Sequence, residues 1–265
     1  MCLIVLALDS HPQYPLVIAG NRDEFLARPS NAADWWRDAP RVLGGRDLEA
    51  GGSWMGVTSN GRLAAVTNYR EAIPRQPEAL SRGNLVAQFL GSPANCATYL
   101  ADVSSRAFAY NGYSLLVGTN LGSPGCEVWV DSNRTLQGAT RLSAGIFGLS
   151  NGPPNSPWPK VVRARRGLKA ALAPMLLDRA QLAHQLMDLL ADPTEARASE
   201  LPTTGVSEEI ERKLSATFVR MPGYGTRTST VFMVDDAGAA FFVERTYNGE
   251  SEPHERKFSF QIEGD

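Results

Sequence analysis

The second residue of the chain, Cys2, occupies a position where an N-terminal nucleophile can form. The first methionine is generally removed when the next residue is small, so Cys2 is expected to become the first residue, with a thiol and a free α-amine. An α-amine titrates near pH ~8 and can therefore take the proton of the thiol near neutral pH. One residue would supply both nucleophile and base, and no histidine would be needed.

Arg22 is the residue that we expect opposite Cys2. Two apolar runs, residues 2–8 and 16–20, flank a loop that contains proline, which predicts an antiparallel strand pair buried on both faces. If Leu8 pairs with Leu16, Cys2 pairs with Arg22, and directly opposed side chains share a face about 5 Å apart. The guanidinium would then stabilise a thiolate and lower its pKa. A slip of one residue would turn Arg22 to the other face.

Each of these residues also has a plainer interpretation. Cys2 would serve equally well as a small residue of a buried first strand, and Arg22 with Asp23 would form an ordinary ion pair at a strand end. Asn68 ends one predicted strand and Asn151 directly follows another, and asparagine at a strand end commonly stabilises a turn. A carboxamide N–H in such a place can instead bind an oxyanion, and losing one such donor costs roughly 10²–10³ in rate.

The residue patterns predict strands, a helical pair, strands, a second helical pair and final strands. This order is typical of antiparallel sheets with helices gathered in layers, and it shows no domain boundary, so one domain over residues 1–265 is expected. The segment 28–52 is rich in Pro, Gly and Trp, and its glycine-rich run 44–52 predicts a set of turns or a mobile lid. Predicted strands cover residues 54–59, 63–68, 113–119, 127–130, 145–150, 228–234, 239–245 and 258–262, and predicted helices cover 79–90, 92–103, 160–173, 178–190 and 207–214.

A local basic stretch begins at Lys160 and ends at Lys169, with no acidic residue between them. Such a stretch is typical of a solvated helix face, and contact with an anionic ligand is the alternative.

Composition excludes several classes of protein. The 265 residues include 26 Lys and Arg and 28 Asp and Glu, so a net charge of −2 argues against a nucleic-acid binder. Three scattered cysteines, with no CxxC or HExxH motif, predict no metal site, no cofactor and a reducing, cytoplasmic setting. The apolar run at the N-terminus is far too short to span a membrane.

Several motifs together resemble a known family. The chain is similar to the NRDE family, which is related to the transport-and-Golgi-organisation 2 proteins, and the matching blocks occur in order from residue 2 to residue 229. They are Met-Cys-Leu-Ile at 1–4, Gly-Asn-Arg-Asp-Glu at 20–24, Gly-Gly-Ser-Trp-Met-Gly at 51–56, Val-Thr-Asn-Tyr-Arg at 66–70, Ser-Arg-Gly at 81–83, Gly-Leu-Ser-Asn at 148–151, Trp-Pro-Lys at 158–160 and Gly-Thr-Arg-Thr-Ser at 225–229.

The resemblance implies an N-terminal-nucleophile hydrolase-like fold, an α+β protein with two antiparallel sheets between helical layers (αββα). It implies that Cys2 is nucleophile and base, and that Arg22 and an acidic neighbour orient it. It also implies that Asn68 and Asn151 contact the oxyanion or the amine, and that Arg227 stabilises charge near the site.

One departure from the amidases of this fold group concerns the acidic neighbour. Their Arg-Asn-x-Asp pattern would place an aspartate where this chain has Phe25. Either Asp23 or Glu24 takes over the role, or the site is altered.

Two functions follow as expectations. The first is a cysteine amidohydrolase that cleaves a C–N amide bond of a small acylated substrate. The second is a non-catalytic binder or carrier of an apolar or acylated ligand, such as a lipid, acyl-CoA or haem, that uses the same cleft.

Overall fold

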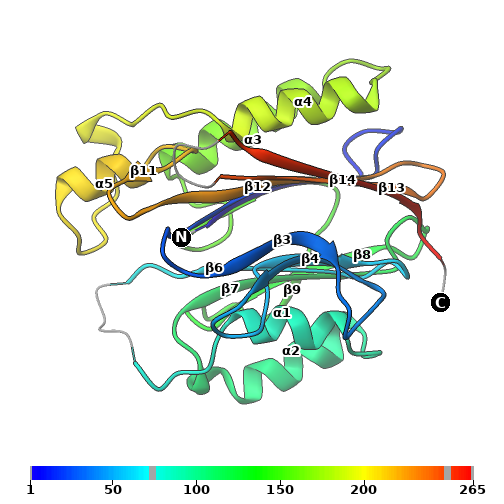
Figure 1. Ribbon diagram of the computed structural model, residues 1–265, viewed down its shortest axis with the longest axis horizontal. Helices are drawn as coiled ribbons and strands as arrows, with labels where there is room; N and C mark the ends of the chain where they lie inside the picture. The colour runs from blue at the N-terminus through cyan, green and yellow to red at the C-terminus, as the bar shows by residue number, and fades with distance from the viewer. Residues whose placement is uncertain (1, 72–75, 248–251, 264–265) are drawn as a thin grey trace.

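Two antiparallel sheets stacked face to face form the centre of the molecule (Figure 1). The computed structural model describes residues 2–71, 76–247 and 252–263, and within these ranges each sheet has seven strands. The first sheet contains, in spatial order, β10 (Gly145–Leu149), β1 (Cys2–Leu8), β2 (Leu16–Phe25), β12 (Tyr224–Val234), β13 (Ala239–Thr246) and β14 (His254–Gln261), with β11 (Arg220–Met221) beside β12. The second contains β3 (Ser30–Trp35), β4 (Val42–Asp47), β5 (Met55–Thr58), β6 (Leu63–Asn68), β7 (Tyr113–Thr119), β8 (Glu127–Ser132) and β9 (Thr140–Arg141).

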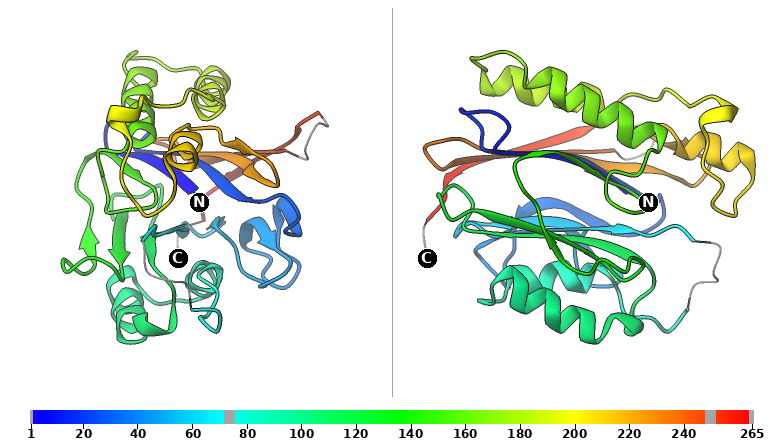
Figure 2. Two further views of the ribbon diagram at one scale, coloured as in Figure 1. Left: turned by 90° about the vertical axis from the view of Figure 1, so that its left-hand side faces the viewer. Right: turned by 180° about the vertical axis from the view of Figure 1, so that it is seen from behind.

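Helices cover the outer faces of both sheets, as Figure 2 shows from two further sides. The first sheet is covered by α3 (Pro159–Ala171) and α4 (Arg179–Leu190), and the second by α1 (Gly83–Leu90) and α2 (Cys96–Ser105). The remaining helix is α5 (Glu208–Leu214), with short 3₁₀ turns at Ala107–Ala109 and Ala198–Glu200. The predicted αββα arrangement is confirmed. No helix among the described residues is both long enough and apolar enough to cross a membrane.

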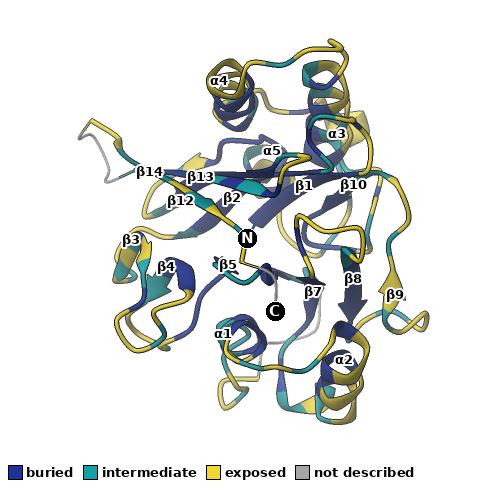
Figure 3. Ribbon diagram, turned by 90° about the vertical axis from the view of Figure 1, so that its right-hand side faces the viewer, coloured by how far each residue is buried: buried dark blue, intermediate teal, exposed yellow. Residues whose placement is uncertain are grey.

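Strand alternation divides the apolar side chains among three cores. In β1, Ile4 and Leu6 point between the sheets, whereas Leu3 and Val5 pack against α3 and α4. A third cluster fills the space between the second sheet and helices α1 and α2. Figure 3 shows the central strands as buried along most of their length. The prediction that the first two strands are buried on both faces is therefore confirmed.

The predicted register of β1 and β2 is confirmed residue by residue. Leu8 pairs with Leu16, and Cys2 pairs with Arg22. The strand β2 continues past Gly20 to Phe25 because β12 pairs with it over this length. The same sheet therefore combines strands from both ends of the described chain, with β12 on the far side of β2 from Cys2.

The glycine-rich run 44–52 differs from its prediction, because its first residues belong to strand β4 rather than to turns. Gly44, read from the sequence as a turn residue, lies inside β4. A Cβ atom on Gly44 would come within 2.7 Å of the Met55 carbonyl oxygen of β5. This glycine therefore allows two strands to approach closely. The first helical pair also begins later than predicted, since Asn95 caps α2 by accepting a hydrogen bond from the Thr98 amide at 2.8 Å.

Candidate functional site

Cys2 lies in the wall of a cleft of about 700 Å³ at one end of the sheets. Its side chain is on the face of β1 that looks toward the second sheet, and 6% of the residue is exposed. The Ser150 hydroxyl donates a hydrogen bond of 2.9 Å to the main-chain carbonyl of Cys2. The main chain of Cys2 is thus fixed by its pairing with β2 and by the hydrogen bond from Ser150.

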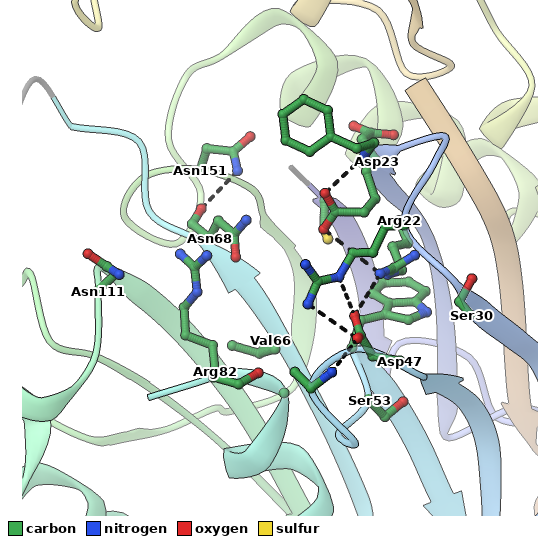
Figure 4. A pocket seen from close by; sticks show the side chains of 18 of the residues that line it. Arg22, Asp23, Ser30, Asp47, Ser53, Val66, Asn68, Arg82, Asn111 and Asn151 are labelled. Carbon is green, nitrogen blue, oxygen red and sulfur yellow. Dashed lines mark hydrogen bonds and ion pairs between the residues drawn. The ribbon is translucent and has the colours of Figure 1, made fainter. Parts of the chain in front are cut away.

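Arg22 faces the cleft beside Cys2 and is anchored by acidic residues (Figure 4). One guanidinium nitrogen, Nη2, lies 3.2 Å from Asp47 Oδ2 and 3.8 Å from Glu24 Oε2. Asp47 also accepts a hydrogen bond of 2.6 Å from Arg28 Nε. The other nitrogen, Nη1, is buried and has no hydrogen-bond partner within the described ranges. Arg22 is therefore fixed in place with one donor group left for a thiolate or a ligand.

The balance of charges at Cys2 differs from the sequence-based expectation. Burial raises the pKa of the Cys2 thiol, and the carboxylates Asp23 and Glu24 raise it further, whereas Arg22 lowers it. The expected effect of Arg22 is present, but burial outweighs it because a buried thiolate loses hydration. A thiol in this setting needs an adjacent base to become a nucleophile.

Asn68 and Asn151 meet on the side of the cleft opposite Arg22 (Figure 4). The Asn151 Nδ2 group donates one hydrogen bond of 2.8 Å to the main-chain oxygen of Asn68. A carboxamide has two N–H donors, so a second one remains on Asn151, which itself is fully buried. The Thr67 hydroxyl donates to the Ser150 carbonyl at 2.6 Å. These two contacts join β6 to the end of β10, which fixes both asparagines relative to Cys2.

The comparison with protein families concerns almost the whole chain. The family described as Transport and Golgi organisation 2 matches residues 1–249. The chain belongs to this family. Its members include homologues from Bos taurus (38% identical, covering 94% of each chain), Homo sapiens (34%, 93% of each chain) and Drosophila melanogaster (30%, 100% of this chain and 98% of the relative). The resemblance drawn from the motifs is confirmed.

Two solved structures are similar in overall arrangement. One is an N-acylethanolamine-hydrolyzing acid amidase ortholog from Caenorhabditis elegans, 12% identical, with a TM-score of 0.49 over 89% of this chain and 93% of that one. The other is the C2A mutant of the conjugated bile acid hydrolase from Clostridium perfringens, 9% identical, with a TM-score of 0.49 over 99% and 97%. The αββα assignment of this family member is based on its own sheets and helices.

The two acidic residues after Arg22 point to opposite faces of β2. Glu24 shares the face of Arg22, whereas Asp23 points toward α3, since side chains alternate along a strand. Asp23 is 1% exposed and accepts a hydrogen bond of 2.7 Å from the Thr226 hydroxyl. Phe25 is 58% exposed and lines the cleft, at the position where the amidase pattern has aspartate. The catalytic role of Asp23 stays a prediction.

Lys160 does not lie on a solvated helix face, contrary to the sequence-based interpretation. It is 1% exposed, and its Nζ lies 3.8 Å from Asp23 Oδ2. The rest of the basic stretch is more exposed, so the stretch divides between a surface part and one buried residue. The charge pattern alone does not distinguish the buried lysine from its exposed neighbours. The Trp-Pro-Lys motif at 158–160 does single out Lys160.

Arg227 is not among the residues that line the cleft. Its Nη1 group donates hydrogen bonds of 3.0 Å to the carbonyl oxygens of Phe25, Leu26 and Arg28. It lies at a β-bulge of β12, where the register with β2 shifts. These contacts stabilise the chain as it leaves β2. The predicted role of Arg227 in stabilising charge stays a prediction.

Glu244 is a buried carboxyl group that the sequence analysis did not select. It lines the cleft from β13 and accepts a hydrogen bond of 2.6 Å from the Ala33 amide, which links the two sheets. Burial raises the pKa of Glu244 to about 7, although hydrogen bonds from Ala33 and Thr230 oppose this rise. A carboxylate directly after the apolar run at residues 239–243 was the available sequence signal. Within the described ranges, no group of three or more His, Cys, Asp or Glu side chains is arranged to hold a metal ion.

Glu244→Gln should stabilise the protein at high pH. Between the ordinary glutamate pKa and about 7, the folded state keeps a proton on Glu244 that the unfolded state has lost, so stability falls as pH rises through this window. Glutamine can accept from Ala33 without a charge. The free energy of unfolding of the Glu244→Gln variant minus that of wild type should therefore rise by on the order of 3 kcal/mol between pH 5 and pH 8.

Urea unfolding at four pH values between 5 and 8 measures this difference, with the exposed Glu209→Gln as control. A constant difference between Glu244→Gln and wild type over that range would contradict the buried-carboxyl explanation.

Proposed function

We propose that this protein is a cysteine N-terminal-nucleophile hydrolase that cleaves a C–N amide bond of a small acylated substrate. The observation that carries the proposal is the placement of Cys2 in a cleft wall, directly opposite Arg22 in the strand ladder, with Asn68 and Asn151 in the same lining. The proposal includes removal of Met1, which would expose the α-amine of Cys2. A cytoplasmic location belongs to the proposal, since the three cysteines are free thiols.

The proposed reaction begins with transfer of the thiol proton to the α-amine as sulfur attacks the substrate carbonyl carbon. A C–S bond forms, and the carbonyl electrons move to an oxyanion that the Asn68 and Asn151 carboxamides would bind. When the oxyanion collapses, the C–N bond breaks and the α-ammonium gives its proton to the leaving amine. Water then hydrolyses the thioester, which restores the thiol of Cys2 and releases a carboxylic acid.

The character of the cleft bears on the alternative function, a carrier of an apolar ligand. Its lining contains a tryptophan, a phenylalanine and several aliphatic residues, but also many charged side chains: Arg22, Arg28, Arg46, Arg70, Arg82, Asp23, Glu24, Asp47, Glu71 and Glu244. Burying charged groups against hydrocarbon is costly. The lining therefore favours a substrate with polar or charged groups over a plain lipid.

The proposal is tested with iodoacetamide, which forms a thioether with a thiolate and releases iodide. Intact mass should first show that the purified protein lacks one methionine residue. At pH 7, Cys2 should then react at least about tenfold faster than Cys96 and Cys126, whose thiol pKa values burial raises to about 11. Peptide mass spectrometry over a time course gives the three rates.

A fusion protein supplies the matched control. A tag that is left in place keeps the thiol of Cys2 but ties its amine into a peptide bond, and this form should lose the fast reaction. Proteolytic removal of the tag, so that Cys2 comes first, should restore it. Equal rates for the tagged and processed forms would refute the role of the amine and would favour the carrier function.

A further inference from the structure

The burial of Lys160 is unusual for its position in the fold. It is the second residue of α3, after Pro159, and a cation in the first turn of a helix opposes the helix dipole. Its side chain is 1% exposed, and within the described residues its Nζ has no hydrogen-bond partner. Burial of an ammonium group is costly unless a charge compensates it. The nearest compensating group is Asp23, whose Oδ2 atom lies 3.8 Å away.

The charged groups that face Lys160 come from several elements. Asp23 belongs to β2 and Cys2 to β1, while Arg70 follows β6 and Glu211 belongs to α5. Arg70 and Glu211 form their own ion pair, with 2.6 Å between Nη1 and Oε2, and largely neutralise each other. The Lys160–Asp23 pair therefore sets the balance of charge on the α3 side of β2, whereas Arg22 and Glu24 lie on the cleft side. Burial lowers the pKa of Lys160, and Asp23 opposes this effect.

The strand register places Asp23 beside the main-chain nitrogen of Cys2. Cys2 pairs with Arg22 and Leu3 with Asn21, so Asp23 continues β2 by one residue on the side of that nitrogen. An α-amine created at Cys2 would therefore lie beside Asp23, whose Oδ2 atom is 3.8 Å from Lys160 Nζ.

We propose that Lys160 is a positioning residue that balances the charge of Asp23, so that the α-amine of Cys2 can be neutral and accept the thiol proton. This inference rests on the proposed function. With Lys160 present, the ion pair is neutral and does not require a second cation. Without it, a buried Asp23 carboxylate would hold a proton on the amine, because an isolated buried charge is unfavourable. The amine would then be blocked as a base until a higher pH.

The test measures the rate of iodoacetamide reaction at Cys2 as a function of pH, on processed protein verified by mass. Lys160→Met should raise the midpoint of this profile by about one pH unit or more, since an opposite charge within ~4–6 Å has an effect of this size. Lys169→Met removes an exposed lysine from the same helix and should leave the midpoint unchanged. A role in folding alone would lower stability without moving the midpoint.

If the Lys160→Met variant does not fold, the same comparison can be made in a protein that also carries Asp23→Asn. Asp23→Asn removes the negative charge and leaves the Lys160 cation uncompensated, which should lower the midpoint by about one unit. Adding Lys160→Met should raise it back to near the wild-type value, because both charges of the pair are then absent. Equal midpoints with and without Lys160 in a folded background, while wild-type Cys2 reacts fast, would overturn the role of Lys160 and leave the proposed function intact. Slow reaction of Cys2 in the wild-type protein would overturn both the role of Lys160 and the proposed function. The measurement on the wild-type protein alone would reveal that outcome.

Discussion

Replacing Arg22 with leucine should slow the iodoacetamide reaction of Cys2 at pH 7 by at least about tenfold. Arg22 is the cation opposite Cys2 in the strand pair, and it lowers the pKa of a thiol whose burial raises it. Loss of an opposite charge at this range raises an acid's pKa by about 1–3 units, and the thiolate fraction falls accordingly. Rates measured by peptide mass spectrometry on the processed protein give the result.

Arg28 provides a matched control for this substitution. It shares the Asp47 carboxylate with Arg22, through 2.6 Å between its Nε and Oδ2. Arg28→Leu therefore removes a cation from the same acidic group, but Arg28 is not the residue opposite Cys2 in the strand pair. Its rate should stay near that of wild type, and Arg22→Lys should keep part of the wild-type rate. If the two leucine variants slowed the reaction equally, the effect would belong to Asp47 and not to Arg22.

The Cys2–Arg22 pairing could be predicted because its causes are local. Two apolar runs of matched length, separated by a short loop with proline, allow few registers that bury both strands. Asn68 and Asn151 were selected because the family resemblance implies a site role for them, whereas their strand-end positions alone favoured turns; both do line the cleft. Sequence motifs, rather than strand-end position, therefore identified these two residues.

Lys160 and Asp47 were not recognised because their surroundings depend on distant segments. Whether a lysine in a basic stretch is buried depends on Asp23, 137 positions earlier, by the difference of their residue numbers. Asp47 closes a strand whose glycines resemble turn residues in the sequence, although Gly44 serves close packing against β5. Alternation of apolar side chains is weak there, so the pattern that normally reveals a strand is missing.

Asn21, the first residue of the Asn-Arg-Asp-Glu motif, makes hydrogen bonds that hold the fold together. The Asn21 Nδ2 group donates hydrogen bonds of 2.8 Å to the carbonyl oxygens of Leu190 and Thr217. Its Oδ1 accepts one of 2.6 Å from the Ser229 hydroxyl. One fully buried side chain thus joins β2 to the end of α4, to the segment before β11 and to β12. The motif combines this link with Arg22, which faces the cleft from the opposite side of the strand.

Asn21→Ala should lower the free energy of unfolding by about 3 to 5 kcal/mol, because each buried polar group that loses its partner costs about 1–3 kcal/mol. Three partners lose a hydrogen bond here, and for a chain of this size the melting temperature should fall by about 10 °C. Urea unfolding measures the change, and the exposed Asn31→Ala is the control. A loss below about 1 kcal/mol would mean that water replaces the three bonds. A large loss with an unchanged rate of reaction at Cys2 in the folded protein would separate the structural half of the motif from its chemical half.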